Sequence, residues 1–343
     1  MRTRFDFLKT LNPSFLSRTA CKLLLNVGCF CCLIEFAHAQ SCTIGAASGS
    51  FGTADVLAGT SIPSTTTFSV NCTGTANNTV RLCIEMGRGA SAAGPSGERA
   101  LTSGANFLDF EFYSDSARTQ MWGSWGSVVT AYGTGGASFD LALGSTGSAN
   151  QTITVYAAIL ASQTTAVPAS YSWNGSSPGL VYGYVSASVC PTGGSTTTSS
   201  GSTWTATVAA NCNISTSALN FGSVSSTIAS NVDASATITA KCTNTTPYSI
   251  GLDNGANASG AQRRVRLAAT ANFVNYNLYT DSARSNAWKT STATTSCTGG
   301  ASTCALGTGT GSNQSVTVYG RIPPQTATAA GLFTDTVVVT VTF

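Results

Sequence analysis

Three blocks of this sequence occur twice, in the same order, and this duplication strongly limits how the chain can fold. Thirty residues separate Cys42 from Cys72, and the same number separates Cys212 from Cys242. The run FEFYSDSAR at 110–118 recurs as YNLYTDSAR at 276–284, and QTITVYAAI at 151–159 recurs as QSVTVYGRI at 314–322. The offset between copies falls from 170 to 163, so the copies differ by short deletions, which fold families place in loops. Two copies are too few for a solenoid, and we predict two tandem domains.

The N-terminus has the features of an export signal. Five basic residues precede or enter a largely apolar stretch at 23–37, and Ala37-His38-Ala39 is a small-x-small cleavage site. The prediction is a signal peptide over residues 1–39 and a mature chain from Gln40. The apolar stretch is too short and too interrupted to predict a membrane span.

Removal of this leader changes the charge balance and excludes several functions. The leader holds five of the 16 basic residues and two of the 13 acidic ones, which leaves 11 of each and no net charge. Nucleic-acid binding needs a basic face, so no nucleic-acid partner is expected. The single histidine, His38, leaves with the leader, and an enzyme that depends on a histidine base is excluded.

Eight cysteines remain after cleavage, an even number that is typical of disulfides in an exported protein. The repeat predicts Cys42–Cys72 and Cys212–Cys242, because each copy keeps that spacing. Cys297 and Cys304 most simply close a local loop, and elimination leaves Cys83–Cys190, a pairing that stays open at this point. Without histidine or CxxC spacing, no metal site or cofactor is predicted.

The texture of both copies predicts antiparallel β-sandwiches. Short runs with period-two alternation, such as 67–72, 80–85, 153–156 and 336–343, are separated by glycine and asparagine turns, and no stretch has a sustained helical period. The predicted domains are residues 40–190 and 211–343. Residues 191–202 have the composition of a flexible linker.

These blocks resemble the spore coat protein U domain, the subunit domain of archaic, Csu-type chaperone–usher pili. The resemblance rests on Leu219-Asn-Phe221-Gly222, the two Tyr-x-Asp-Ser-Ala-Arg turns, residues 316–322 and the closing segment 331–343; it is weaker over 40–190. It implies two tandem immunoglobulin-like antiparallel β-sandwiches, the second lacking its final strand. It further implies that a periplasmic chaperone, and then the arm of an adjacent pilus subunit, supplies that strand during assembly at an outer-membrane usher.

The resemblance also suggests a place in the fibre. Only Gln40 and Ser41 lie between the expected cleavage site and Cys42, so we expect a subunit that accepts a strand and donates none, as at a pilus tip. The expected acceptor edge is the last strand, with one face formed by Val337, Val339, Val341 and Phe343. A second segment, 203–210, alternates in the same way and is either a spacer or a strand that completes the first domain in cis, through Trp204, Ala206, Val208 and Ala210.

Several candidate catalytic or binding motifs have simpler structural interpretations. Gly175-Ser-Ser177-Pro-Gly179 matches a nucleophile elbow as a string but lacks a histidine base, so we interpret it as a loop. Asp109 and Glu111 could form a carboxylate pair, although a solvated strand face is favoured. Asp253-Asn254-Gly255 is typical of a turn, and a calcium site is a distant second interpretation. The repeated Asp115/Arg118 and Asp281/Arg284 pairs, and Trp122 with Trp288, are expected to maintain the fold.

Apolar side chains that only the first copy places in expected loops are the candidates for surface contact. They are Trp125, Val128, Val129, Tyr132, Val167 and Trp173. The predicted function is that of a non-enzymatic tip adhesin, exported through the periplasm to the surface of a Gram-negative cell, which attaches to abiotic or host surfaces and supports biofilm formation. Two alternatives remain open: a lectin-like tip that uses Asp109, Glu111 and Trp125, and a structural coat or pilus-body component.

Overall fold

A computed structural model gives the structure of the chain and describes residues 40–89, 97–129, 132–133, 135–184, 190, 194–268, 270–293 and 296–343. These residues form two β-sandwiches, and the only helical segment among them is a 3-10 turn at Ala301–Thr303. No helix within the described part of the chain is long and apolar enough to cross a membrane. The expected signal peptide lies outside the described residues.

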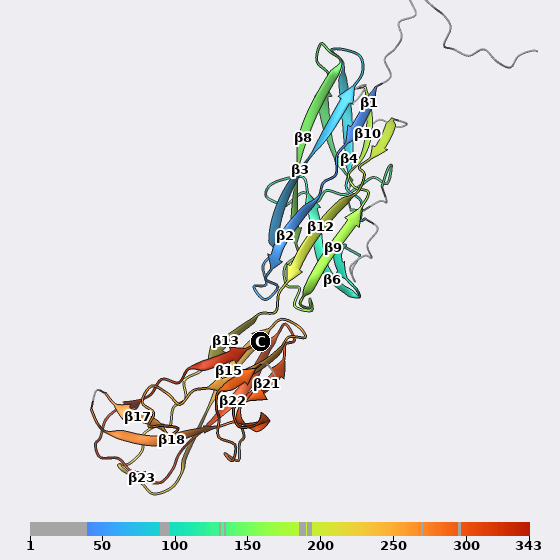
Figure 1. Cartoon of the computed structure of the whole chain (residues 1–343). Coiled ribbons are helices and arrows are strands. Elements are labelled where there is room, and N and C mark those ends of the chain that lie inside the picture. Colours follow the sequence, from blue (N-terminus) through green and yellow to red (C-terminus); the bar gives the residue numbers. More distant parts are fainter. Residues whose placement is uncertain are drawn as a thin grey trace, which may run out of the picture. The chain divides into compact units, whose positions relative to one another are not determined.

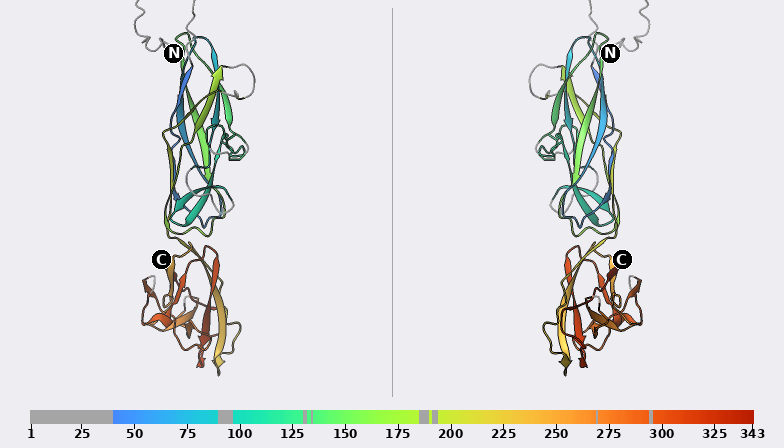
Figure 2. Two further views of the ribbon diagram at one scale, coloured as in Figure 1. Left: turned by 90° about the vertical axis from the view of Figure 1, so that its right-hand side faces the viewer. Right: turned by 90° about the vertical axis from the view of Figure 1, so that its left-hand side faces the viewer.

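The first sandwich packs an eight-stranded sheet against a four-stranded sheet (Figure 1). In spatial order the larger sheet contains β1 (Ser41–Ile44), β3 (Ile62–Thr73), β8 (Ser148–Ile159), β6 (Asn106–Tyr113), β5 (Arg99–Ser103), β9 (Ala169–Gly175), β12 (Ser202–Val208) and β2 (Gly49–Ala54). The smaller sheet contains β11 (Ser195–Thr198), β10 (Gly179–Tyr184), β4 (Thr79–Glu85) and β7 (Ala137–Ala142). The two side views show the long strands of this sandwich running along its length (Figure 2).

The second sandwich repeats this plan with fewer strands. Its larger sheet contains β13 (Cys212–Thr216), β15 (Val232–Cys242), β22 (Asn313–Ile322), β18 (Phe273–Tyr279), β17 (Arg263–Leu267) and β24 (Phe333–Thr334). Its smaller sheet contains β21 (Ala305–Thr308), β16 (Pro247–Leu252) and β25 (Val339–Thr342). Two short pairs complete it: β14 (Thr227–Ile228) with β23 (Gln325–Thr326), and β19 (Ser291–Ala293) with β20 (Ser296–Cys297).

Among the described residues there are four disulfides, which are the pairs expected from the repeat, from a local loop and by elimination: Cys42–Cys72, Cys212–Cys242, Cys297–Cys304 and Cys83–Cys190. In each sandwich the repeated pair joins the first strand to its antiparallel neighbour, where the two cysteines lie directly opposite each other.

The expected linker is not free of secondary structure. Residues 195–198 form β11, which pairs with β10 of the first sandwich. Serine and glycine enrichment led to the prediction of a flexible segment, but Thr196, Thr197 and Thr198 have a branched Cβ that suits a paired strand. The flexible linker predicted over 191–202 is therefore wrong at these positions.

The repeated tryptophans and Asp/Arg pairs occupy equivalent places in both cores. Trp122 and Trp288 are each 1% exposed, and their Nε1 atoms donate to the carbonyl oxygens of Ile84 and Ile250 at 2.9 and 3.1 Å. The Asp281 carboxylate accepts the backbone N–H groups of Ser285 and Asn286, and Arg284 lies at φ 58° in the left-handed region. Asp115 and Arg118 form the same turn in the first sandwich.

This turn predicts a loss of stability in acid. The hydrogen bonds from Ser285 and Asn286 lower the pKa of Asp281 to about 2. Since the unfolded value is about 3.9, the stabilisation is fully present above pH ~4 and is lost as the pH falls toward 2. Asp281→Asn should therefore flatten the fall in the melting temperature of the second sandwich between pH 4 and pH 2, measured by circular dichroism. An unchanged pH dependence in the variant would contradict this assignment.

Candidate functional site

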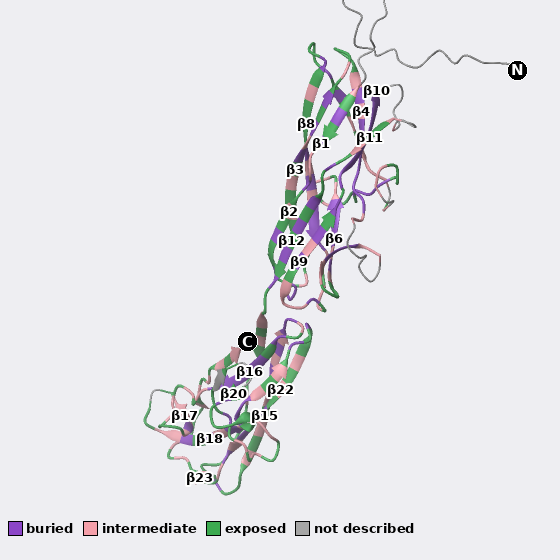
Figure 3. Ribbon diagram, turned by 45° about the vertical axis from the view of Figure 1, so that its right-hand side comes forward, coloured by how far each residue is buried: buried purple, intermediate pink, exposed green. Residues whose placement is uncertain are grey.

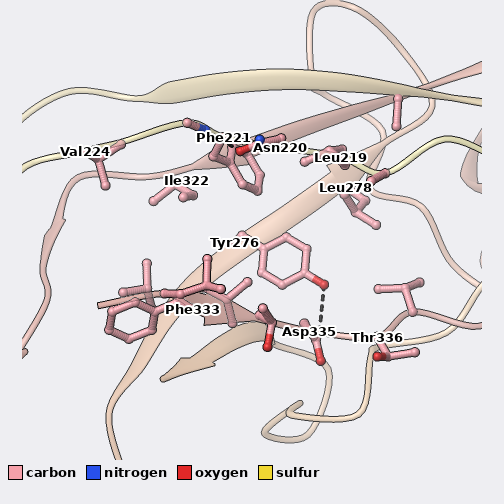
Figure 4. A pocket seen from close by; sticks show the side chains of 18 of the residues that line it. Leu219, Asn220, Phe221, Val224, Tyr276, Leu278, Ile322, Phe333, Asp335 and Thr336 are labelled. Atoms are coloured by element: carbon pink, nitrogen blue, oxygen red, sulfur yellow. Dashed lines mark hydrogen bonds between the residues drawn. The ribbon is translucent and has the colours of Figure 1, made fainter. Parts of the chain in front are cut away.

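The second sandwich contains an open groove of about 810 Å³. One wall is formed by residues 216–226, which begin at the last residue of β13, and the other by residues 329–337, which include β24. Its floor comes from β15, β18 and β22, through residues such as Ile238, Leu278 and Ile322. Figure 4 shows the last two. Two apolar side chains at this groove, Val224 and Leu332, are 44% and 80% exposed.

The equivalent place in the first sandwich holds a strand. There β12 lies between β9, to which it is antiparallel, and β2, to which it is parallel. The internal offset of 170 matches β2 to residues 219–224, which line the groove and form no strand. Thr102 of β5 pairs with Ser172 of β9, and Arg266 of β17 pairs with Thr334 of β24. Since β5 and β17 are equivalent strands of the two sandwiches, β9 corresponds to β24. The groove is thus the space that β12 fills in the first sandwich.

The inserted strand β12 buries alternate side chains. Trp204, Ala206 and Val208 are at most 3% exposed, whereas the threonines between them are exposed, and the alternation is visible in Figure 3. Trp204 packs against Phe51 and Phe112 with ring centroids 5.2 and 5.4 Å apart. Ala210, expected to be a fourth inward residue, is exposed. That expectation is wrong because the pairing with β9 and β2 ends at Val208.

The predicted acceptor edge needs a correction at its C-terminal end. The closing segment changes sheets: β24 pairs with β17 in the larger sheet, and β25 pairs with β16 in the smaller one. As a result Val337 and Val339 line the groove and Val341 packs against the core away from it. Phe343 follows β25 and is 45% exposed, so it does not share the inward face. The groove therefore adjoins β24 and the residues up to Val339 rather than the terminal residues.

A polar pair interrupts the apolar lining of the groove. The hydroxyl of Tyr276 donates to Oδ2 of Asp335 at 2.7 Å (Figure 4). The backbone N–H of Asn257 donates to Oδ1 of Asp335 at 3.0 Å. Burial, and then the hydrogen bond to Asp335, raise the pKa of Tyr276. Asp335 is the one charged residue among those that line the groove. The repeat did not suggest this pair, since the first sandwich has Phe110 and Trp173 at these positions, in contact at 5.8 Å.

The loop that carries the predicted apolar contacts lies at one end of the smaller sheet of the first sandwich, where β4 ends and β10 begins. Trp125 is 45% exposed, and Val128 and Val129 are half-buried. The buried carboxylate of Glu85 accepts the backbone N–H groups of Ser127 and Val128 at 3.1 and 3.2 Å. The structure therefore presents Trp125 to solvent on a loop whose backbone a buried carboxylate fixes.

The two valines of this loop sit against glycines. A Cβ at Gly179 would lie 2.9 Å from Val129 and 3.0 Å from Val128, and a Cβ at Gly87 would lie 2.9 Å from Val129. The loop thus packs closely on the strand ends beneath it. This close packing explains why Val128 and Val129 are only partly exposed.

Trp173 is not in a loop, and its predicted role in surface contact is wrong. It is fully buried in β9, where its ring contacts Phe110 and Phe112 and its Nε1 donates to the carbonyl oxygen of Arg88 at 2.6 Å. The Asn-Gly pair that follows it suggested a turn, but the strand continues through Gly175. An indole with a buried N–H partner is a core residue.

Val167 and Tyr132 take different places from that expected. Val167 is half-buried and lies shortly before the first residue of β9. Its backbone N–H donates to the Tyr171 hydroxyl, which in turn donates to its carbonyl oxygen. Val128 and Val129 pack near Gly179, beyond the other end of β9, so about seven residues at ~3.3 Å each separate the two sites. Tyr132 is half-buried, and its hydroxyl donates to the Glu111 carboxylate.

The predicted solvated face for Glu111 is wrong because the side chain is buried in an ion pair. Glu111 is 2% exposed and accepts Nη1 of fully buried Arg99 at 2.6 Å. Arg99 also donates to the carbonyl oxygens of Gly87 and Trp122, at 2.9 and 2.8 Å. Asp109 is half-buried, and burial raises its pKa, followed by the charges of Glu98 and Glu111. Its neighbour Glu111 is thus unavailable to a ligand.

A buried arginine recurs in the second sandwich, which the repeat blocks did not reveal. Arg263 donates from Nε to the carbonyl oxygen of Asp253 at 2.9 Å and from Nη2 to that of Trp288 at 2.9 Å. Burial lowers the pKa of both guanidinium groups. No cluster of three or more potential metal ligands occurs among the residues that the structure describes.

The two sandwiches, one filled by its own inserted strand and one with an open groove, define a tandem immunoglobulin-like protein whose second domain lacks a strand. The model of the Spore Coat Protein U domain matches residues 29–172 and again residues 197–340. The chain belongs to the spore coat protein U domain family.

One solved structure shares this fold, and another is similar to this chain at a lower score. One is a chain of the CsuC–CsuE chaperone–tip adhesion subunit pre-assembly complex from archaic chaperone–usher Csu pili of Acinetobacter baumannii, 18% identical, with a TM-score of 0.51, over 88% of this chain and 100% of that one. Another is the CupB6 tip adhesin from Pseudomonas aeruginosa, 12% identical, with a TM-score of 0.35, over 90% and 95% of the two chains. None of the curated proteins compared with this chain matches its sequence.

Proposed function

We propose that this chain is a tip adhesin subunit of a chaperone–usher pilus, exported through the periplasm to the surface of a Gram-negative cell. The observation that carries the proposal is the contrast between the two sandwiches: β12 fills the first, and the equivalent groove of the second is open. An unpaired groove with apolar walls is suited to strand addition, in which main-chain bonds give affinity and alternate side chains fill pockets. The fold shared with the complex from A. baumannii supports this proposal.

In this proposal the second sandwich is the anchor. Its groove receives a strand of a periplasmic chaperone first and the N-terminal arm of the adjacent pilus subunit later, at the outer-membrane usher. The first sandwich needs neither partner, because β12 completes it in cis. The domain roles follow: residues 40–190 with β12 form the adhesive part, and residues 211–343 form the part that joins the fibre.

Surface attachment is assigned to the loop that carries Trp125. The exposed part of its ring offers roughly 100 Å² of apolar area, which is about 2–3 kcal/mol on burial. Such contacts repeated over many pili give attachment, and hence biofilm formation, without a specific sugar. The glycan-binding alternative is not favoured, because Glu111 is committed to Arg99.

Trp125→Ser should reduce attachment of piliated cells to polystyrene several-fold, while the melting temperature of the purified protein falls by no more than a few °C, since the residue is 45% exposed and the covered side of its ring lies against Gly135 and Gly136. Leu306→Ser is the matched control, because Leu306 is 43% exposed but belongs to the second sandwich. Equal attachment of the two variants would rule out the assignment of this loop.

Strand acceptance is tested by expressing the chain with and without the periplasmic chaperone of a Csu-type pilus. The open groove should make the soluble yield depend on the chaperone, and a complex should survive size-exclusion chromatography. If the chain is fully soluble and monomeric alone and does not bind the chaperone, the second sandwich is complete without a partner, and the proposed function fails.

A further inference from the structure

The two sandwiches differ at the two positions that flank Trp204 of β12 in the first one, where Gly49 lies on one side and Trp173 on the other. We infer that Gly49 and Leu219 give them different strand specificities: the open groove of the second sandwich takes a small or hydroxylated side chain where β12 carries Trp204, and so rejects β12 of another copy of this chain. This inference rests on the proposed function, since it concerns the partner of the same groove.

In the first sandwich the missing side chain of Gly49 makes room for the indole. Trp204 lies opposite Gly49 in the parallel pairing of β12 with β2, and its Nε1 donates to the carbonyl oxygen of Ala47 at 2.6 Å. A Cβ at Gly49 would lie 2.6 Å from the Trp204 ring, closer than real Cβ contacts. Any side chain at position 49 would therefore compete with the indole for the same volume.

In the second sandwich a leucine stands at the matched position. The offset of 170 that aligns Phe51-Gly52 with Phe221-Gly222 also aligns Gly49 with Leu219. Leu219 lines the groove beside Phe221 (Figure 4), and both reach over the floor strand β22: a Cβ at Gly320 would lie 2.9 Å from Cδ1 of Leu219 and from Cζ of Phe221. An indole in the register of Trp204 would have to displace the Leu219 side chain.

The opposite wall of the groove also disfavours a tryptophan at this position, because it carries a charged side chain. In the antiparallel pairing Trp204 faces Trp173, and the strand register matches Trp173 to Asp335. An incoming side chain at this point therefore meets a carboxylate and the Tyr276 hydroxyl instead of an indole. A threonine or serine fits this environment because it is small and can donate a hydrogen bond. An acidic residue there is repelled by Asp335.

Rejection of Trp204 has a direct use. Each copy of the chain carries both a strand of the right length and an open groove, and a match between them would allow head-to-tail polymers that do not close. The leucine at 219 and the carboxylate at 335 act against that pairing while leaving the groove open to another strand.

The test joins a second copy of residues 202–208 to Phe343 of the full chain through a flexible glycine–serine linker, which gives it a high effective concentration at the groove. Three versions carry Trp, Thr or Asp at the position of Trp204, each in the native chain and in Leu219→Gly. In the native chain the Thr version should raise the melting temperature of the second sandwich by about 5–10 °C, and the Trp and Asp versions should not. In Leu219→Gly the Trp version should now stabilise the protein.

The outcomes separate the two levels of the proposal. If the Trp and Thr versions stabilise the native chain equally, the inferred specificity is wrong and strand acceptance stands. If the Trp version stays inactive in Leu219→Gly while the Thr version works, Leu219 is not the determinant and the inference is overturned. If no version stabilises either protein, the groove does not accept a strand in this register, and the proposed function fails together with the inference.

Discussion

Trp204→Ala should destabilise the first sandwich by about 3–5 kcal/mol and leave the second unchanged. The indole is fully buried between Phe51 and Phe112, and its removal leaves a cavity and an unpaired carbonyl oxygen at Ala47. Tryptophan fluorescence during urea unfolding measures the effect, because Trp288 is the one tryptophan of the second sandwich.

Thr205→Ala is the matched control for this change. Thr205 neighbours Trp204 on β12 but points to solvent, so the control should lose well under 1 kcal/mol. If the two variants unfold at the same urea concentration, β12 is a peripheral spacer and does not complete the sandwich.

Arg99→Met should destabilise the first sandwich by about 3–5 kcal/mol as well, for an electrostatic reason. The substitution leaves the buried Glu111 carboxylate without its ion-pair partner and the carbonyl oxygens of Gly87 and Trp122 without a donor. Urea unfolding of Arg99→Met, Glu111→Gln and the double variant forms a double-mutant cycle. The double variant should be less destabilised than the sum of the single ones.

Strict additivity in that cycle would show that the two side chains do not interact in solution. The same variants also test the support of the loop that carries Trp125. The Tyr132 hydroxyl donates to Glu111, and the carbonyl oxygen of Trp122 accepts a hydrogen bond from Arg99. Arg99→Met should therefore lower both attachment and stability, whereas Trp125→Ser should lower attachment and largely keep stability.

The duplicated blocks contained enough information to predict the fold and two of the disulfides, Cys42–Cys72 and Cys212–Cys242, because recurrence within one chain identifies residues that both copies need. Asp115 and Asp281, like Trp122 and Trp288, were assigned to the fold for this reason, and the structure places each pair in equivalent positions. Recurrence also has a limit. Arg99 and Arg263 lie outside the repeated blocks, so nothing in the sequence marked them as buried.

The candidate sites were harder to predict than the fold, because they depend on whether a neighbouring strand covers a residue or leaves it open. Trp173 preceded an Asn-Gly pair and was expected in a turn, although Tyr171, Trp173 and Gly175 alternate as a buried face does. Phe343 continued the alternation of the last strand, but the pairing with β16 ends at Thr342. Alternation identifies a strand and its faces; it does not tell where hydrogen-bonded pairing stops.

The pairing of β12 has a consequence for how the molecule bears tension. Residues 209–211 leave its Val208 end, whereas the Trp125 loop lies near Gly179, toward the opposite end of β9. If the Trp125 loop attaches to a surface and the second sandwich joins the fibre, as proposed above, a pull between them acts along the axis of β12 and tends to slide it past β9 and β2. Sliding requires the hydrogen bonds on both edges to break together, whereas peeling would break them one at a time. In the proposed function, we therefore expect β12 to resist extraction by such a pull better than a strand that is loaded for peeling.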